Sequence, residues 1–252
     1  MTAAPHAVVT GGGSGIGLAI ARALAGAGHP LTIMGRNRAR LDAALADLPG
    51  ARALACDVGD GDAVAAAFAD AAGAAGPVGL LVNCAGVVRT APFEKGDDAL
   101  WADLWRTNVI GCVNTCRAVL PGMRALPSAR IVNIASTASL KGYAYVSAYT
   151  ATKHALLGLT RSLALELAGT AITVNAVCPG YADTEIIRQS IATIVARTGR
   201  SEADALATFT GTNPQGRLID PDEVAATVLW LAADAARSVT GQAIVVAGGE
   251  VM

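Results

Sequence analysis

One tyrosine and one lysine stand at a spacing suited to proton transfer. Tyr149 precedes Lys153 by one helical turn within Ser-Ala-Tyr-Thr-Ala-Thr-Lys-His, so on a helix both side chains share a face. A free phenol, with a pKa of about 10, is a poor base at neutral pH. A fixed cation beside a phenol favours the phenolate. The pair is therefore a candidate acid–base couple for a carbonyl or alcohol oxygen, although alone it would fit an ordinary exposed helix pair.

Ser136 is the candidate partner of this couple. It follows the apolar run 130–135, which is typical of a buried strand. Doubly wound folds bind their ligands at the carboxyl ends of strands. The Ser136 hydroxyl would therefore hold the substrate oxygen near Tyr149.

A glycine-rich loop follows the first apolar run of the chain. Its pattern is G-x-x-x-G-x-G from Gly11 to Gly17, and an Ala/Leu helix comes next. Glycines allow a left-handed turn and a close backbone approach, and a helix start attracts a pyrophosphate. Leu18 stands where a P-loop needs lysine, and Ile16 where a nucleophile elbow needs glycine. Dinucleotide binding is favoured over a plain glycine-rich turn.

The end of the second apolar run indicates which dinucleotide. An NAD site commonly has an acidic residue about 20 residues after the loop, but this chain has Arg36 and Asn37 there, and its first acid is Asp42. An arginine grips a phosphate through two hydrogen bonds. NADP(H) is therefore favoured. NAD(H) stays open, because an arginine at this position would also fit a role in stacking on the adenine or a solvated surface position. Asp57, after the third apolar run, would bind the adenine amino group.

These residues need a scaffold that brings strand ends together. Apolar runs alternate with helical patterns, and unbroken runs are typical of strands covered on both faces. We expect a Rossmann-type, doubly wound α/β fold with a parallel seven-stranded sheet, helices on both faces, and one domain over 1–252. The stretch at about 183–216 departs from the alternation and is predicted to be a helical substrate lid. The expected strands are 6–10, 31–35, 52–56, 78–83, 130–135, 172–178 and 243–247, and the expected helices are 16–27, 38–48, 60–75, 99–120, 147–168 and 221–234.

Composition excludes several classes of protein. With 19 basic and 20 acidic residues the net charge is −1, which argues against nucleic-acid binding. The apolar fraction of 53% is above the usual ~45–50%, which indicates a folded chain that buries surface against its own copies. No apolar stretch is long enough to span a membrane, and the start of the chain does not resemble a signal peptide. Five scattered cysteines fit a reducing cytoplasm, and the three histidines show no metal spacing.

These motifs together resemble the short-chain dehydrogenase/reductase family over nearly the whole chain. Thr10–Gly17 is similar to its cofactor loop, and Asn83-Cys84-Ala85-Gly86 is similar to its NNAG motif with Cys84 in place of asparagine. Asn108 matches the family's catalytic asparagine, which holds a helix distortion and a proton-relay water. The resemblance implies that the catalytic residues are Asn108, Ser136, Tyr149 and Lys153, and that the cofactor-binding residues are Gly11, Ser14, Gly15, Ile16, Gly17, Arg36, Asn37, Asp57, Val58, Asn83, Ala85, Gly86, Tyr149, Lys153, Pro179, Gly180 and Thr184.

The resemblance implies hydride transfer between nicotinamide and a substrate carbon. Tyr149 would exchange the proton, Ser136 would polarise the oxygen, and Lys153 would assist the phenol and bind the nicotinamide ribose. Ile131–Gly180 is most similar to ketoacyl and polyketide ketoreductases. A hydrophobic or acyl-type carbonyl substrate is expected, with the candidate wall residues Val88, Tyr143, Tyr145 and Tyr181.

Three further expectations concern partners and the chain end. Helix 147–168 carries small and apolar residues at helical spacing, which in this family accompanies a homotetramer. An acyl carrier protein would need basic residues near the cleft; Arg124 and Arg130 are present, but the turn at Thr170 offers none. The ending Ala-Gly-Gly-Glu departs from the family's commoner V-D-G-G, and the sequence alone gives it no role.

Two alternatives to an NADP(H)-dependent ketone reductase stay open. One is an NAD-dependent secondary alcohol or hydroxyacyl dehydrogenase. The other is a non-catalytic dinucleotide sensor on the same fold, which would not need all four catalytic residues.

Overall fold

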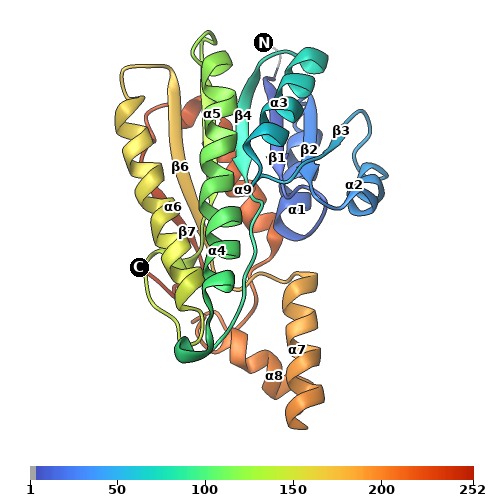
Figure 1. Ribbon diagram of the computed structural model, residues 1–252, viewed down its shortest axis with the longest axis vertical. Coiled ribbons are helices and arrows are strands. Elements are labelled where there is room, and N and C mark those ends of the chain that lie inside the picture. The colour runs from blue at the N-terminus through green and yellow to red at the C-terminus, as the bar shows by residue number, and fades with distance from the viewer. Residues whose placement is uncertain (1–3) are drawn as a thin grey trace.

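Seven parallel strands form one sheet in the order β3-β2-β1-β4-β5-β6-β7 in the computed structural model, which describes residues 4–252 (Figure 1). Residues 1–3 of the predicted domain lie outside the described residues. The predicted α/β class and parallel sheet are confirmed. The strands are β1 (His6–Thr10), β2 (Leu31–Gly35), β3 (Arg52–Ala55), β4 (Val78–Asn83), β5 (Ala129–Ile134), β6 (Ile172–Pro179) and β7 (Ala243–Val246).

Helices cover both faces of the sheet. One core cluster joins the sheet to α3, α5 and α6, and a second joins its other face to α1, α2 and α9. The chain order reverses between β1 and β4, which both pair with their neighbours in parallel, and ligands of doubly wound folds bind beside that reversal. The α-helices are α1 (Gly15–Gly26), α2 (Arg38–Leu45), α3 (Gly61–Ala75), α4 (Asp98–Trp105), α5 (Gly111–Met123), α6 (Ser147–Glu166), α7 (Glu185–Thr198), α8 (Glu202–Thr210) and α9 (Pro221–Ala232).

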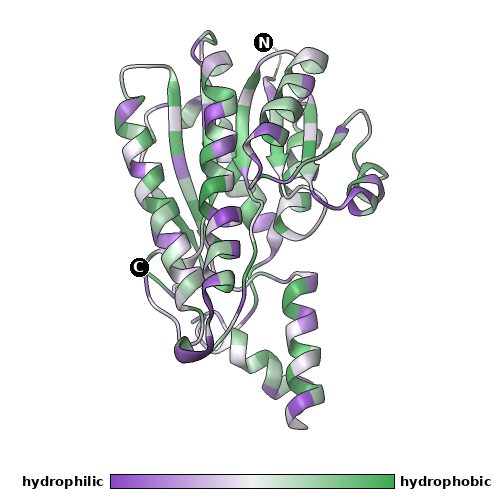
Figure 2. Cartoon of the chain, in the orientation of Figure 1, coloured by the Kyte–Doolittle hydropathy of each residue, from purple (hydrophilic) through white to green (hydrophobic). Residues whose placement is uncertain are grey.

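Alternate side chains of each central strand enter opposite core clusters. On β4, Leu81 belongs to one cluster while Leu80 and Val82 belong to the other, and all three are fully buried. Complete burial of a side chain of this size stabilises the fold by roughly 1.5–3 kcal/mol. Figure 2 shows the sheet as largely hydrophobic, with polar residues on the outer sides of the helices.

The helix expected over 99–120 is not continuous. A π-helical turn, Arg106–Ile110, separates α4 from α5. A π turn adds one residue to a helical turn and is frequent at functional sites. Here it contains Asn108, whose side chain bonds to two other segments rather than to its own helix.

Helices α7 and α8 occupy most of the stretch predicted as a lid. They project beyond the carboxyl edge of the sheet (Figure 1), and each buries little: Ile191 on α7 and Ala205 on α8. No helix within residues 4–252 is long and apolar enough to cross a membrane.

A buried network of neutral side chains joins the sheet to α5 and α6. Asn83 on β4 donates to Asn133 on β5 (2.9 Å) and accepts from Thr115 on α5 (2.7 Å). Asn133 in turn donates to Thr160 on α6 (2.9 Å) and accepts from the Cys112 thiol (3.3 Å). Because buried polar groups are costly unless paired, this network fixes how α5 and α6 lie on the sheet.

We predict that Asn133→Ala lowers the free energy of unfolding by about 2–4 kcal/mol, because it leaves several buried partners unpaired. Urea unfolding followed by circular dichroism measures the change. Thr173→Val is the matched control, since the buried Thr173 hydroxyl has no hydrogen-bond partner among the described residues. Equal destabilisation by both variants would contradict the role of the network.

Candidate active site

A cleft of about 270 Å³ opens at the carboxyl edge of the sheet. The glycine loop forms one side, and the residues after β4 and β5 form the floor. Tyr149 and Lys153 close the other side from α6, and the start of α7 lies over the mouth. Residues of the cleft include Gly11, Ser14, Gly15, Ile16, Gly17, Ala85, Gly86, Val88, Tyr149, Lys153 and Thr184, all expected from the sequence.

Lys153 reaches the cleft through the protein interior. The residue is 6% exposed, its Nζ donates to the Ile134 carbonyl at 2.9 Å, and Nζ lies 5.7 Å from the centre of the Tyr149 ring. A buried ammonium needs hydrogen-bond partners, and it has three N–H donors. Its bond to Ile134 therefore fixes the side chain and leaves donors for a ligand.

Ser136 is the next residue in the chain after Ile134 and Ala135, which both line the floor of the cleft. Its Oγ accepts a hydrogen bond from the Ala138 amide at 3.1 Å. Because the hydroxyl accepts in this bond, its own proton stays available for a substrate oxygen.

Asn108 ties three segments together beneath the cleft. Its Oδ1 accepts from the Val87 amide (2.8 Å), and its Nδ2 donates to the Val87 carbonyl (2.9 Å) and to the Thr152 hydroxyl (3.1 Å). Thr152 is the neighbour of Lys153 on α6. The π turn thus holds the loop after β4 in fixed relation to the lysine.

The glycine loop is packed closely enough to require glycine. Gly11 and Gly15 have φ of 69° and 52°, values that side-chain-bearing residues seldom adopt. A Cβ on Gly17 would lie 2.7 Å from the Gly11 carbonyl carbon. The Thr10 hydroxyl accepts from the Cys84 and Ala85 amides, both at 3.1 Å, which joins this loop to the loop after β4.

The residues expected at the adenosine end lie beyond β2 and β3. Arg36 is exposed, and Asn37 caps α2 by accepting from the Arg40 amide at 3.0 Å. Asp57 accepts from the Gly59 amide and from Arg106, both at 3.0 Å. Although burial opposes it, these hydrogen bonds lower the pKa of Asp57. Its carboxylate is therefore charged and already oriented at neutral pH.

Four predicted cofactor residues are held within the scaffold around the cleft. The Asn83 side chain lies in the neutral network beneath the cleft and precedes the loop after β4. Pro179 ends β6, and the Gly180 amide donates to the Val246 carbonyl at 3.0 Å. Val58 is buried against Gly111 at the π turn.

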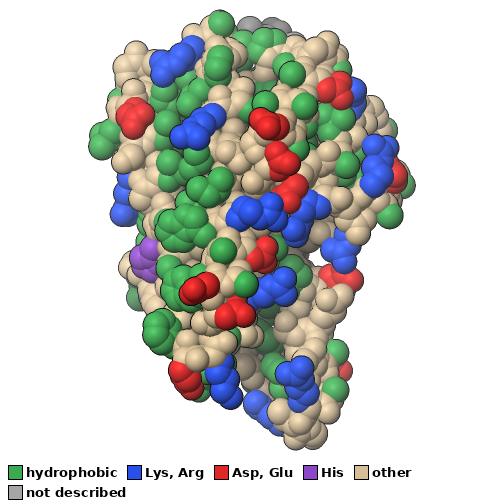
Figure 3. Space-filling view, in the orientation of Figure 1, with side chains coloured by type: hydrophobic (Ala, Val, Ile, Leu, Met, Phe, Trp, Pro, Cys, Tyr) green, Lys and Arg blue, Asp and Glu red, His purple; other side chains and the backbone are tan. Residues whose placement is uncertain are grey.

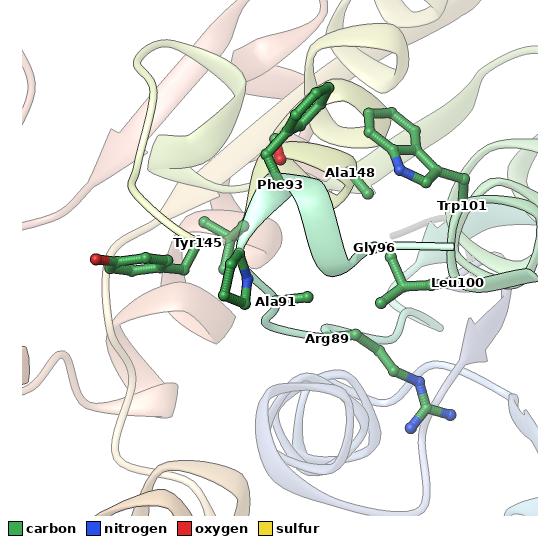
Figure 4. Close-up of a pocket in the computed structure, with 11 residues that line it drawn as sticks. Arg89, Ala91, Phe93, Gly96, Leu100, Trp101, Tyr145 and Ala148 are labelled. Atoms are coloured by element: carbon green, nitrogen blue, oxygen red, sulfur yellow. The ribbon is translucent and has the colours of Figure 1, made fainter. Parts of the chain in front are cut away.

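The four candidate substrate residues differ in environment. Val88 lines the cleft and is partly exposed. The Tyr143 hydroxyl donates to Glu250, and its ring makes an edge contact with Tyr181, with ring centres 6.3 Å apart. Tyr145 has a left-handed backbone (φ 66°) and is 67% exposed. Figure 4 shows its ring pointing away from the small pocket formed by residues 89–101 and 145–148.

Sequence reasoning missed an ion pair at the mouth of the cleft. Arg40 and Glu185 both line the cleft, with a separation of 3.7 Å between Arg40 Nη2 and Glu185 Oε2. The pair joins α2 to the start of α7. No local pattern in the sequence indicates it, because the two residues are brought together only by the fold.

The structure also shows where the possible metal ligands and the two arginines considered for carrier-protein docking lie. Within residues 4–252, no cluster of His, Cys, Asp or Glu could hold a metal ion, and all five cysteines are free. Arg124 is exposed, but Arg130 is only 4% exposed and its Nη2 lies 3.5 Å from Asp234. Arg130 lies near the start of β5, away from the cleft, so it is unsuited to meet a carrier protein.

Comparisons with known proteins agree with this geometry. Residues 5–194 match the model of the short chain dehydrogenase family. A putative ketoacyl reductase of granaticin polyketide synthase from Streptomyces violaceoruber is 41% identical, covering 98% of this chain and 93% of its own. Galactitol 2-dehydrogenase from Cereibacter sphaeroides is 39% identical over 96% and 93%. A crystal structure of an actinorhodin polyketide ketoreductase variant with NADPH superposes with a TM-score of 0.93, at 37% identity over 98% and 97%.

We predict that Gly17→Ala weakens dinucleotide binding at least about tenfold, because overpacking at the loop costs on the order of 1–3 kcal/mol. Fluorescence titration with NADPH measures the dissociation constant. Gly26→Ala is the control, since a Cβ at that helical glycine meets nothing within 4 Å. Unchanged affinity in Gly17→Ala would show that the loop does not approach the ligand.

Proposed function

This chain belongs to the short-chain dehydrogenase family, and we propose that it transfers a hydride between NADP(H) and a ketone or secondary alcohol. The observation that carries the proposal is that Tyr149 and Lys153 share one cleft with the glycine loop. A site built only to bind a dinucleotide has no need of an acid–base pair beside it. A catalytic oxidoreductase is therefore favoured over a non-catalytic dinucleotide sensor.

The residues present fit a dinucleotide. Gly17 packs against the Gly11 backbone near the start of α1, which holds the loop at the helix N-terminus, where unpaired N–H groups favour a pyrophosphate. The exposed Arg36 after β2 offers a guanidinium to a 2′-phosphate. The solved relative with NADPH supports the same choice. When bound, the nicotinamide supplies or accepts the hydride.

The protein's own groups move the proton and hold the substrate. In the reductive direction the Tyr149 hydroxyl gives its proton to the substrate oxygen as that oxygen gains negative charge. The Ser136 hydroxyl donates to the same oxygen, which stabilises the charge as it develops. Lys153, fixed by the Ile134 carbonyl, provides a positive charge beside the phenol. Asn108 keeps the loop after β4 and α6 in register during these steps.

An aromatic cluster beside Ser136 and Gly180 supports a substrate class. Tyr143, Tyr181 and Phe209 make successive edge contacts, with ring centres 6.3 and 5.2 Å apart. An aromatic wall favours a hydrophobic or acyl-type carbonyl. The ketoreductase relatives support this class. The second candidate is an NAD-dependent secondary alcohol or hydroxyacyl dehydrogenase, and the galactitol 2-dehydrogenase relative supports its secondary-alcohol part.

The proposal extends to assembly and compartment. Three large apolar side chains stand exposed on or beside α4 and α6: Trp105, Ile110 and Leu165. Figure 3 shows hydrophobic side chains gathered over this face. Such a surface supports a homotetramer, and five free cysteines support a reducing compartment such as the cytoplasm.

We predict that the chain turns over members of a panel of aliphatic and aromatic ketones and secondary alcohols. Absorbance of the reduced nicotinamide reports turnover with NADP(H) and NAD(H) in parallel. In Tyr149→Phe, kcat falls roughly 100- to 10,000-fold because the proton donor is lost, while NADPH affinity is kept. Tight cofactor binding without turnover in the wild-type chain would indicate a sensor instead.

We predict that Arg36→Ala raises the dissociation constant of NADPH at least about tenfold, because a charge-assisted bond to the 2′-phosphate is lost. The constant for NADH changes little, since NADH has no 2′-phosphate. Arg38→Ala is the matched control, because Arg38 already pairs with Asp42 at 2.9 Å. Equal loss for both nucleotides would place Arg36 elsewhere on the cofactor.

A further inference from the structure

The C-terminal glutamate is buried beside the candidate substrate wall. The Glu250 side chain is 1% exposed, an unusual state for a carboxylate unless it is paired. Gly248 and Gly249 have φ of 60° and 94°, so both adopt conformations that favour glycine. The double glycine turns the chain back and directs Glu250 inward. The structure thus gives the Gly-Gly-Glu ending a physical consequence, which is separate from the replacement of the family's aspartate by Ala247.

Two donors meet one oxygen of this carboxylate. The Tyr143 hydroxyl donates to Glu250 Oε1 at 2.6 Å, and Lys141 Nζ lies 3.1 Å from the same atom. The Tyr143 oxygen is also 2.6 Å from the Thr137 hydroxyl. Lys141 lies 4.8 Å from the centre of the Tyr143 ring. Glu250 therefore holds the segment that follows Ser136 at two points.

Glu250 also lies close to the segment that follows β6. Glu250 Oε2 lies 3.1 Å from the position that a Cβ would take on Gly180, and Tyr181 packs edge-on against Tyr143. Burial raises the pKa of Tyr181, and the charge of Glu250 acts in the same direction. Tyr181 also follows Gly180 directly in the chain, so the aromatic pair lies beside the segment that ends β6.

We propose that Glu250 is a positioning residue for substrate recognition, which fixes Tyr143 and Tyr181 as one rigid aromatic wall beside Ser136 and Gly180. The Tyr143 hydroxyl is engaged by Glu250 and Thr137, so the ring rather than the hydroxyl faces the neighbouring Tyr181. Such a wall selects substrates with a bulky cyclic apolar group next to the carbonyl. A small open-chain ketone has no group that reaches the wall and does not depend on it. This inference rests on the proposed reductase function.

The experiment compares two ketones, α-tetralone and butanone, in the wild-type chain and in Glu250→Ala, Glu250→Gln and Tyr143→Phe. For α-tetralone we expect KM to rise about tenfold in Glu250→Ala and Tyr143→Phe, the effect of losing about one good hydrogen bond. For butanone, KM stays within about twofold, as does the dissociation constant of NADPH. Glu250→Gln keeps an acceptor for Tyr143 and retains most of the wild-type preference.

A merely structural glutamate would give a different pattern. It would raise KM for both ketones equally, or would lower only the melting temperature, and either result would overturn the proposal. The double variant Glu250→Ala/Tyr143→Phe should be no worse than either single one, because both remove the same contact. Glu166→Ala, at an exposed glutamate on α6, is the matched control. If Glu250→Ala does not fold, Tyr143→Phe and Glu250→Gln decide the question.

Calorimetric binding of α-tetralone to the NADPH-loaded chain tests the proposed reductase function and the proposed role of Glu250 separately. Binding that depends on Glu250 without any turnover in the wild-type chain would contradict the proposed function and support the wall. Turnover of both ketones with no dependence on Glu250 would support the reductase function and contradict the proposal that Glu250 positions the aromatic wall. A wild-type chain that neither binds nor reduces α-tetralone would contradict the wall.

Discussion

A buried ammonium at the carboxyl edge of the sheet is the constraint on which the site depends. Lys153 is almost fully enclosed, and an unpaired charge in that position would cost several kcal/mol. The Ile134 carbonyl at 2.9 Å offsets part of that cost, but only if α6 lies against β5 in one register. The 2.9 Å hydrogen bond from Asn133 on β5 to Thr160, further along α6, fixes the helix and the strand in that register. The placement of one charge thus requires the packing of a whole helix on a strand.

The neutral and charged networks have separate tasks. The asparagine and threonine network beneath the cleft orients α5 and α6 without adding charge. The Glu250–Lys141 pair at the substrate wall contains one charge of each sign, so its field falls off quickly with distance. Lys153 stands apart from both networks, with its Nζ 5.7 Å from the centre of the Tyr149 ring.

The sequence predicted those parts of the molecule that depend on local pattern. Unbroken apolar runs located the strands to within about one residue, because a strand buried on both faces has few alternatives. The pairing of Tyr149 with Lys153 needed only the helical repeat. The π turn at Asn108 was not visible in the apolar pattern of 99–120, and only the family resemblance implied a distortion there, because the side chain bonds to Val87 and Thr152 in distant segments.

The position of Glu250 could not be predicted for a related reason. Its burial depends on two glycine conformations and on a lysine and a tyrosine more than a hundred residues earlier. The sequence marked only that Ala247 stands where the family commonly has an aspartate, and it gave Glu250 no role. The Tyr143 hydroxyl is held by this buried carboxylate, Tyr181 packs edge-on against Tyr143, and Phe209 on α8 packs edge-on against Tyr181. These contacts join segments that are distant in the sequence, so no local pattern could have predicted them.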